Sequence, residues 1–528
     1  MNNLMHTWEK EKKLLLFTLA ATFFWGILAH GYGIMDSNFS HDSLTEFNSL
    51  IFGNQVKISV GRFFVPIYRN FSRTDLTLPW LIGILGLFWC GLAVYLTIRL
   101  FRIENKGMIF VTAGIFTVNL TVTSTIATFI HDFDCDMLSL LFAVAAAFCW
   151  KKHPWGWLAG IPLLVLSLAL YQSYIAVTIV MVMFVCILDL LEEQSFRDVF
   201  IRGLKAVAML LLGGAVYYIA MKTVLKLTGI TMLTGQYNTL DKALDIMSLS
   251  VMDLRYLIRL TYLSWYEKLV NAISPYPAIS ALATKLILFF IAGSVFLGLL
   301  NRKVKLSEKL LCLVLLILLP FAMNIMTFMT LEQAHELMRF AFWLTYLLAL
   351  LLGRWLAEYL KEAVLPRISE IPGIITKIPV MLCSLLIVTL VYGGVQTANA
   401  MYLKKDLEHD AYMAVVNRVI YRMESFEDYE PGVTPIVMVG LPEQIADIVP
   451  GFETYRDPNG MYLSDALCFS TPDRWQRYLD YTMMNPAVLA NSEVWDSMLT
   501  DPRVVAMPSY PDPGCMAVID GVLVVKLS

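Results

Sequence analysis

The sequence predicts a polytopic α-helical membrane protein with about eleven transmembrane helices and a small C-terminal α/β domain. Two observations lead to this fold class. The 528 residues are 58% apolar and only 16% charged, whereas soluble proteins average about 45–50% apolar and about 25% charged residues. Apolar runs of about 20 residues, the length that crosses the hydrocarbon core of a bilayer, recur along the chain as far as residue 396.

Eleven apolar runs are predicted to span the membrane. The first run lacks a small-x-small cleavage site and continues into Gly31, Tyr32 and Gly33, so we expect a retained helix rather than a signal peptide. The fourth and fifth runs are short. The predicted spans are residues 14–35, 79–99, 108–130, 137–151, 155–171, 173–190, 204–222, 281–300, 309–329, 339–360 and 378–396.

The distribution of Lys and Arg predicts the orientation of these spans. The N-terminus and every second short loop are basic, with Lys10, Arg102, Lys151, Arg202 and Lys303 among their residues. The loops between them are acidic or polar. Because basic loops stay on the cytoplasmic side of a membrane, we expect a cytoplasmic N-terminus and an extracytoplasmic segment after residue 397.

Three segments on the predicted outer side are long enough to fold. Loops 36–78 and 223–280 are expected to contain amphipathic helices on the outer leaflet; the alternative for the second is a peripheral packing helix without substrate contact. A change in composition divides the chain into a transmembrane domain, residues 1–400, and an extracytoplasmic domain, residues 401–528. This second domain is predicted to contain a helix at 401–425, a strand at 435–440 and a hairpin at 515–526 that turns at Asp520-Gly521. It also holds Cys468 and Cys515, which could pair in an oxidising compartment.

Ionisable residues cluster in the predicted outer loops, where the cost of charge near a bilayer makes them functional candidates. A carboxylate there can take the proton from an acceptor hydroxyl while Arg or Lys stabilises a leaving phosphate. The clusters are Asp36, His41, Asp42, Glu46, Lys57 and Arg62 in the first loop, His131, Asp132, Asp134 and Asp136 in the second, and Glu332, His335, Glu336 and Arg339 in the fifth.

The acids of the first loop also have structural interpretations. Asp36 lies where the first span leaves the membrane, as acids at interfaces often do. Asp42 is too distant from that helix end to cap it, but it could cap a loop helix with Glu46 in the first turn.

The acids of the second loop likewise have two interpretations. Asp132, Asp134 and Asp136 either share a divalent ion with a substrate phosphate or stabilise a helix N-terminus at Met137. An EF-hand is excluded because Met137 and Ala143 occupy the positions of its glycine and its glutamate. Arg62 and Arg339 suit phosphate because a guanidinium binds two oxygens at once, or else each pairs with a nearby carboxylate.

Several function classes are excluded. The sequence contains no GxxxxGK[ST], no GxGxxG after a strand, no GxSxG and no HExxH. A net charge of -3 without a basic run argues against a nucleic-acid partner. The eight cysteines show no CxxC or Cys/His spacing, which argues against a structural zinc site.

The order of four motifs resembles the bacterial glucosyltransferase II family, whose members modify O-antigen. An acidic first outer loop ends in Gly61-Arg62, an acidic turn opens the fourth span, and a late segment runs from His335 to Arg339. The most specific element is the run from Ser167 to Ser173, with Leu-Tyr-Gln at an outer helical hairpin. The resemblance covers about residues 10 to 400, and it departs from the family where His41 replaces the first of two adjacent aspartates.

This resemblance implies a GT-C type glycosyltransferase in the bacterial cytoplasmic (inner) membrane. Its donor would be a polyprenyl-phosphate sugar, with glucose expected, and its acceptor a lipid-linked or surface glycan. A companion flippase and a donor-synthesising enzyme would supply the donor, and Mg²⁺ or Mn²⁺ is a candidate cofactor. Asp42 is then the expected general base, and Arg62, Arg339 and His335 are expected to bind the donor phosphate. Asp134 and Asp136 would orient the acceptor or a metal, with Asp36, Tyr171, Gln172 and Glu336 lining the pocket.

Two rival functions share these features. A lipid-linked glycan transporter or flippase would need ionisable residues at mid-membrane, and few are found there. A glycan polymerase or ligase would differ mainly in its acceptor. In the C-terminal domain, the aromatic residues Trp475, Tyr478, Trp495 and Tyr510 either stack on sugars or, as is commoner in small domains, form the core.

Overall fold

The computed structural model describes residues 2–36, 38–47, 53–235, 249–271, 277–363, 375–442, 450–455 and 457–528. In these ranges, nine helices are long and apolar enough to cross a membrane, and α6 and α9 are shorter apolar helices. The chain is thus mostly helical, as expected of a polytopic membrane protein, although the count of eleven spans is not confirmed. The helices of the bundle are α1 (Asn2–Met35), α5 (Pro79–Leu100), α6 (Lys106–Thr117), α7 (Leu120–Phe129), α8 (Phe133–Lys152), α9 (Gly156–Leu170), α10 (Ile175–Leu191), α11 (Phe196–Thr228), α13 (Val251–Asn271), α14 (Pro277–Leu300), α15 (Leu306–Met323), α16 (Ile325–Thr330), α17 (Phe340–Ala363) and α18 (Ile378–Glu424).

The third predicted span, 108–130, is wrong as a single helix, because Asn119 divides it into α6 and α7. The Asn119 side chain donates to the carbonyls of Ile115 and Phe116, both at 3.1 Å, and its oxygen accepts from the Val122 N–H at 3.0 Å. The Asn119 side chain therefore provides hydrogen-bond partners for backbone groups at the end of α6 and at the start of α7. Hydropathy does not detect such a break, because the residues on both sides are apolar.

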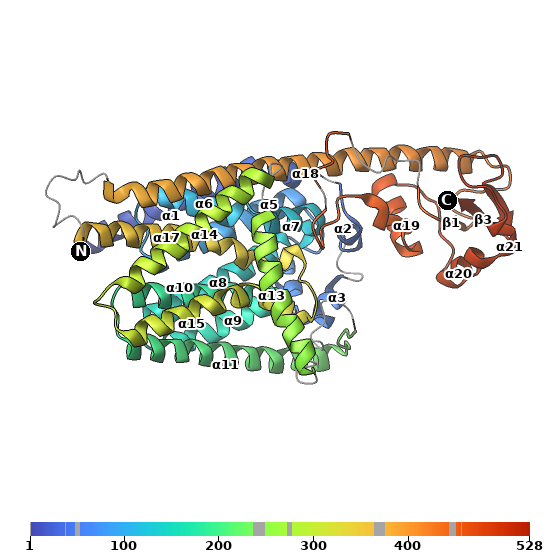
Figure 1. Ribbon diagram of the computed structural model, residues 1–528. Coiled ribbons are helices and arrows are strands. Elements are labelled where there is room, and N and C mark those ends of the chain that lie inside the picture. Colours follow the sequence, from blue (N-terminus) through green and yellow to red (C-terminus); the bar gives the residue numbers. More distant parts are fainter. Residues whose placement is uncertain are drawn as a thin grey trace.

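The predicted helix 401–425 is confirmed, but it is not separate from the last span. Both belong to α18, a helix of 47 residues, which at about 1.5 Å per residue is about 70 Å long. No Gly or Pro lies between Gly394 and Pro431 to end it. Figure 1 shows α18 running along the whole bundle and on into the C-terminal domain, so the boundary predicted near residue 400 falls inside a continuous helix.

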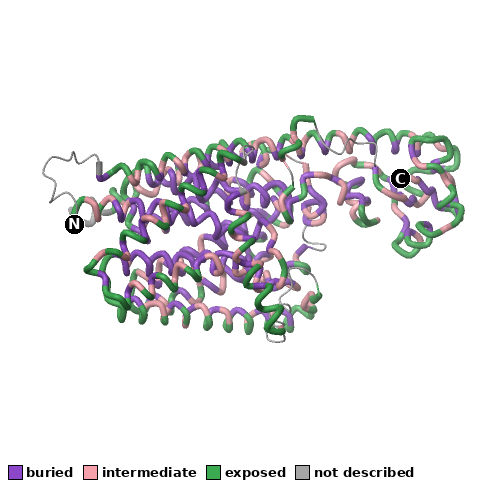
Figure 2. Tube along the Cα trace, viewed as in Figure 1, coloured by how far each residue is buried: buried purple, intermediate pink, exposed green. Residues whose placement is uncertain are grey.

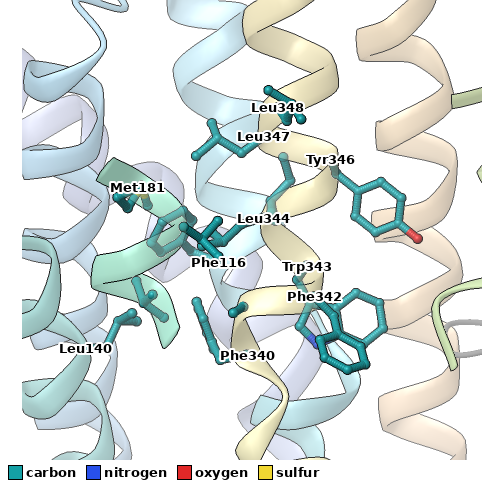
Figure 3. Close-up of a cluster of buried hydrophobic side chains, with 14 of the residues drawn as sticks. Phe116, Leu140, Met181, Phe340, Phe342, Trp343, Leu344, Tyr346, Leu347 and Leu348 are labelled. Atoms are coloured by element: carbon teal, nitrogen blue, oxygen red, sulfur yellow. The ribbon is translucent and has the colours of Figure 1, made fainter. Parts of the chain in front are cut away.

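The bundle core is centred on α17, which is buried along most of its length (Figure 2). Figure 3 shows its side chains packed against residues of neighbouring helices, with the Phe340 and Phe116 rings 5.6 Å apart. The Trp343 indole N–H donates to the Thr121 hydroxyl at 3.1 Å, which ties α17 to α7. In α5, a Cβ on Gly86 would lie 2.4 Å from the Phe133 ring, so glycine is needed for the close approach of the start of α8.

Residues 36–78, the first loop predicted to be structured, contain three short helices: α2 (His41–Thr45), α3 (Gly53–Ser59) and α4 (Val65–Ser72). Their placement on the outer leaflet stays a prediction. For the loop 223–280, the amphipathic helix is α13, which packs against α14, α15 and α16. Two parts of that prediction, residues 236–248 and 272–276, lie outside the described residues.

The C-terminal domain contains a small sheet, and its predicted strand and hairpin are confirmed. β1 (Ile436–Val439) pairs in parallel with β3 (Val522–Lys526), which pairs antiparallel with β2 (Met516–Ile519). The hairpin turns at Asp520 and Gly521, both with positive φ, the pattern of a two-residue type I′ turn. Cys468 and Cys515 are free and buried. Short helices complete the domain: α19 (Pro472–Tyr478), α20 (Ser492–Thr500) and α21 (Pro502–Val505).

Candidate active site

A cavity of about 390 Å³ lies at the end of the bundle that adjoins the C-terminal domain. Figure 1 places α2 and α3 at this end, with α2 beside α19. The wall combines the first outer loop, the acidic turn before α8, the segment before α17 and two residues of the C-terminal domain. Its polar lining residues are His41, Asp42, Thr45, Glu46, Lys57, Arg62, His131, Asp132, Asp136, His335, Tyr462 and Arg474.

Asp132 holds the cationic side of the cavity together. Its carboxylate contacts the Lys57 ammonium at 2.5 Å, an Arg69 guanidinium nitrogen at 2.6 Å and the Arg62 guanidinium at 3.4 Å. Glu46 accepts from Arg69 at 2.7 Å. Burial alone would raise the pKa of Glu46, but the nearby Lys57 and Arg69 cations lower it to about 2. The two carboxylates therefore stay charged and fix three cations around them.

The hairpin between α9 and α10 supports the Arg62 side chain and the loop that carries it. Its guanidinium carbon lies 4.3 Å from the centre of the Tyr171 ring. Gln172 donates to the Val60 carbonyl and to the Tyr217 hydroxyl, both at 2.9 Å, and Tyr217 donates to the Gly61 carbonyl at 3.0 Å. Tyr171 and Gln172 are thus absent from the cavity wall and position the loop that carries Arg62. The Arg62 Nε is buried without a hydrogen-bond partner.

Two acidic side chains of the cavity remain open to a ligand. Asp136 is 4% exposed, lines the cavity, and forms no hydrogen bond or ion pair with another described residue. The Asp42 side chain is 37% exposed, and one of its oxygens lies 3.3 Å from His41 Nε2. Burial lowers the pKa of His41, which keeps this imidazole neutral near pH 7. The structure therefore brings Asp42, Asp136 and Arg62, three predicted site residues, into one cavity.

Four other predicted site residues do not line it. Asp134 is fully buried in a two-pronged pair with Arg73, at 2.9 and 3.2 Å. Arg339 pairs with Glu336 at 3.1 Å, and both side chains are buried. Asp36 accepts from the Asn38 backbone N–H at 2.9 Å, near the end of α1, and burial raises its pKa. His335, in contrast, lines the cavity as expected, and burial lowers its pKa.

The helix that carries Asp42 is held between the two domains. Ser43 donates to the Thr128 carbonyl of α7 at 3.1 Å. On the other face of α2, Leu44 is buried in the hydrophobic core of the C-terminal domain, and the Arg477 side chain donates to the Thr45 carbonyl at 3.3 Å. The position of Asp42 therefore depends on docking of the C-terminal domain.

The C-terminal domain also supplies Tyr462 and Arg474 to the wall. The Tyr462 ring meets the His41 ring edge to face at 5.3 Å, and its backbone N–H donates to the Thr128 hydroxyl at 2.9 Å. Beside it, Gly460 has a φ of +80°, and a Cβ there would lie 2.5 Å from the His335 ring. Neither Tyr462 nor Arg474 was predicted, because no local motif marks them.

Trp475, Tyr478, Trp495 and Tyr510 are buried, which supports the core interpretation.

A metal site built on Asp134 and Asp136 does not fit this geometry, because Arg73 already occupies both oxygens of Asp134. Across the described ranges, no three His, Cys, Asp or Glu residues are grouped to hold a metal ion. Two further acidic residues of the predicted clusters, Glu46 and Asp132, hold cations.

Comparison with known proteins identifies the family. The model of the family described as glucosyl transferase GtrII matches residues 31–352, which is more than half of the chain and includes every loop of the bundle that lines the cavity. No curated protein and no solved structure matches the chain. The resemblance seen in the sequence is thereby confirmed, and the chain belongs to the glucosyl transferase GtrII family.

Proposed function

We propose that the protein transfers glucose from polyprenyl-phosphate-glucose to a surface or lipid-linked glycan, such as O-antigen, outside the cytoplasmic membrane. One observation carries the proposal: a single cavity at the end of an apolar bundle sets Lys57 and Arg62 beside the open acidic side chains of Asp42 and Asp136. Phosphate-stabilising cations next to a base are what transfer of a sugar from a lipid phosphate requires.

The donor would bind on the side of the cavity that holds the cations. Arg62 has a buried Nε free to donate, and a guanidinium matches the oxygens of a phosphate. Apolar side chains share the same cavity, among them Val56, Val60, Leu337 and Met338. This combination favours a phosphate attached to a hydrocarbon chain over a nucleotide, so the donor class of GT-C enzymes fits the site.

Asp42 is the general base in this proposal. Its carboxylate takes the proton of the acceptor hydroxyl, the hydroxyl oxygen bonds to the anomeric carbon, and the bond from that carbon to the phosphate oxygen breaks. The electron pair leaves with polyprenyl phosphate, whose charge Arg62 and Lys57 stabilise. The His41 ring lies against the Asp42 carboxylate, with Nε2 3.3 Å from one of its oxygens. Asp136, deeper in the cavity, accepts hydroxyl hydrogens of the donor sugar.

The acceptor would enter beside the C-terminal domain. Tyr462 offers a partly exposed ring to a sugar face. Arg474 uses one nitrogen for the Ser470 hydroxyl at 2.9 Å and the Leu467 carbonyl at 3.4 Å, which leaves other N–H groups for acceptor oxygens. The proposal places this domain and the cavity outside the cytoplasmic membrane, so a flippase and a donor-synthesising enzyme must supply the donor.

The test is a transfer assay with the purified full-length protein in liposomes. Polyprenyl-phosphate-glucose and a nucleotide-linked glucose are offered in parallel with an O-antigen acceptor. Glucose transfer from the lipid donor alone supports the proposal, and transfer from the nucleotide donor alone contradicts it. A requirement for Mg²⁺ or Mn²⁺ stays a prediction that the same assay measures with and without a chelator.

A further inference from the structure

A second, larger cavity lies at the opposite end of the bundle. It has a volume of about 1050 Å³ and runs between the start of α6, the second half of α17 and the start of α18. Most of its wall is apolar, including Met108, Phe110, Val111 and Val388. Met381 and Leu385 of α18 line it and are also exposed by 59% and 64%, so the groove is open sideways to the bilayer. Its shape and polarity suit hydrocarbon chains.

Cations lie at one end of this groove. Arg102, Arg354 and Lys377 line it there, and the single carboxylate in the lining, Glu104, is paired with Lys10 at 2.9 Å. Arg354 is held by the carbonyls of Phe101 and Arg102, at 2.6 and 3.1 Å from Nη1. Its Nε and Nη2 make no hydrogen bond to other described residues. The Arg354 guanidinium is thus held in place by Nη1, and its other N–H groups can donate to a ligand.

A polar cavity of about 520 Å³ adjoins the groove, because Arg102 and Arg354 line both. In it, Lys151 and Arg202 each contact Asp189 at 2.6 Å, and Glu192 and Glu358 add two carboxylates. Across the two cavities, cations outnumber carboxylates by five to four even when Glu104 is counted. An anionic headgroup is therefore favoured over a neutral one, and the carboxylates provide acceptors for headgroup hydroxyls.

We propose that these joined cavities bind one anionic glycerophospholipid of the phosphatidylglycerol class. Its acyl chains lie in the apolar groove, its phosphate contacts Arg102 and Arg354, and its headgroup hydroxyls donate to Glu192 and Glu358. Basic residues beside an apolar groove at a membrane interface are the chemistry that recognises such lipids. The site is separate from the candidate active site and does not depend on the proposed transfer reaction.

Native mass spectrometry of the full-length protein, purified in detergent and titrated with defined lipids, tests the proposal. Phosphatidylglycerol should bind about five-fold more tightly than phosphatidylethanolamine, and Arg102→Gln should weaken its binding about five-fold, the effect of one interfacial cation. Lys303→Gln is the matched control, since Lys303 is an exposed cation in the α14–α15 loop that lines neither cavity. The Lys303→Gln variant should bind phosphatidylglycerol as tightly as the wild type does.

Arg102→Gln is the chosen variant because Arg354 also supports the α5–α6 loop through two backbone carbonyls, so Arg354→Gln would test folding as well. Equal affinities for the two phospholipids would overturn the proposal, as would unchanged binding in Arg102→Gln. Tighter binding of polyprenyl phosphate than of phosphatidylglycerol would overturn it too, and would assign the site to the lipid carrier instead.

Discussion

The Arg62 guanidinium lies over the Tyr171 ring, 4.3 Å from its centre, so a loop residue of the cavity is held by a helical hairpin more than 100 positions away. Cation–π contacts of this kind contribute about 0.5–2 kcal/mol. The contact explains how Tyr171 can serve the site without lining the cavity. It also separates two roles, binding of donor phosphate by Arg62 and positioning of Arg62 by Tyr171.

Tyr171→Leu should therefore raise the KM for the lipid donor by about 2- to 30-fold, the range set by the lost cation–π contact. The acceptor KM should not change. Tyr171→Phe keeps the ring and is the matched control, expected near the wild type. Steady-state kinetics with each substrate varied in turn provides the measurement, and an equal effect of both substitutions would argue against a role for the ring.

Asp134→Asn should lower stability far more than it lowers catalysis. The substitution leaves the Arg73 cation buried without its counter-charge, and breaking a buried pair costs about 3–5 kcal/mol. Thermal unfolding in detergent measures this loss, while the KM for the donor in the folded fraction should stay at the wild-type value. The double variant Asp134→Leu with Arg73→Met should recover part of the stability, because neither charge is then left alone. A large change in donor KM would instead place Asp134 in the reaction.

The stability of the protein should fall in acid because of Glu46. Its pKa of about 2 in the folded protein lies below the ordinary 4.5, so the charged form contributes stability above pH 4.5 that is lost as the pH falls through about 2. The contribution is about 3 kcal/mol. Glu46→Gln should be less stable than the wild type near neutral pH, and its unfolding midpoint should fall less between about pH 5 and about pH 3. Parallel pH profiles of the two proteins would contradict this account.

The C-terminal domain should determine acceptor affinity. Arg474→Gln is expected to raise the acceptor KM by about 10-fold or more, the cost of a hydrogen bond to a charged group, and Tyr462→Ala should raise it as well. The donor KM should change little in either variant. Tyr421→Ala removes an aromatic ring that is 74% exposed and remote from the cavity, and serves as the control. A rise in donor KM instead would move these two residues to the donor side of the site.

Much of this fold could be predicted from the sequence, because hydropathy reports the long spans directly and turn residues report the hairpin at Asp520. The break at Asn119 could not, since it depends on a side chain that caps two helices at once. The site was predicted in part: Asp42, Asp136, Arg62 and His335 meet as expected. Asp134 and Arg339 lie outside the cavity wall, Asp134 because folding brings Arg73 to it and Arg339 because it pairs with Glu336, three positions earlier in the chain. Tyr462 and Arg474 reach the cavity only through docking of a domain that no local motif connects to it.

The role of Asp42 as general base is tested by glucose transfer with wild type and Asp42→Asn protein, purified and assayed side by side with polyprenyl-phosphate-glucose and an O-antigen acceptor. The account predicts transfer by the wild type and a loss of about 10²- to 10⁴-fold in the variant, the contribution of a general base, with both proteins equally folded. Full activity of Asp42→Asn would contradict the assignment of the base. A wild type that transfers no sugar but moves a lipid-linked glycan across the liposome would contradict the enzyme itself and identify a transporter.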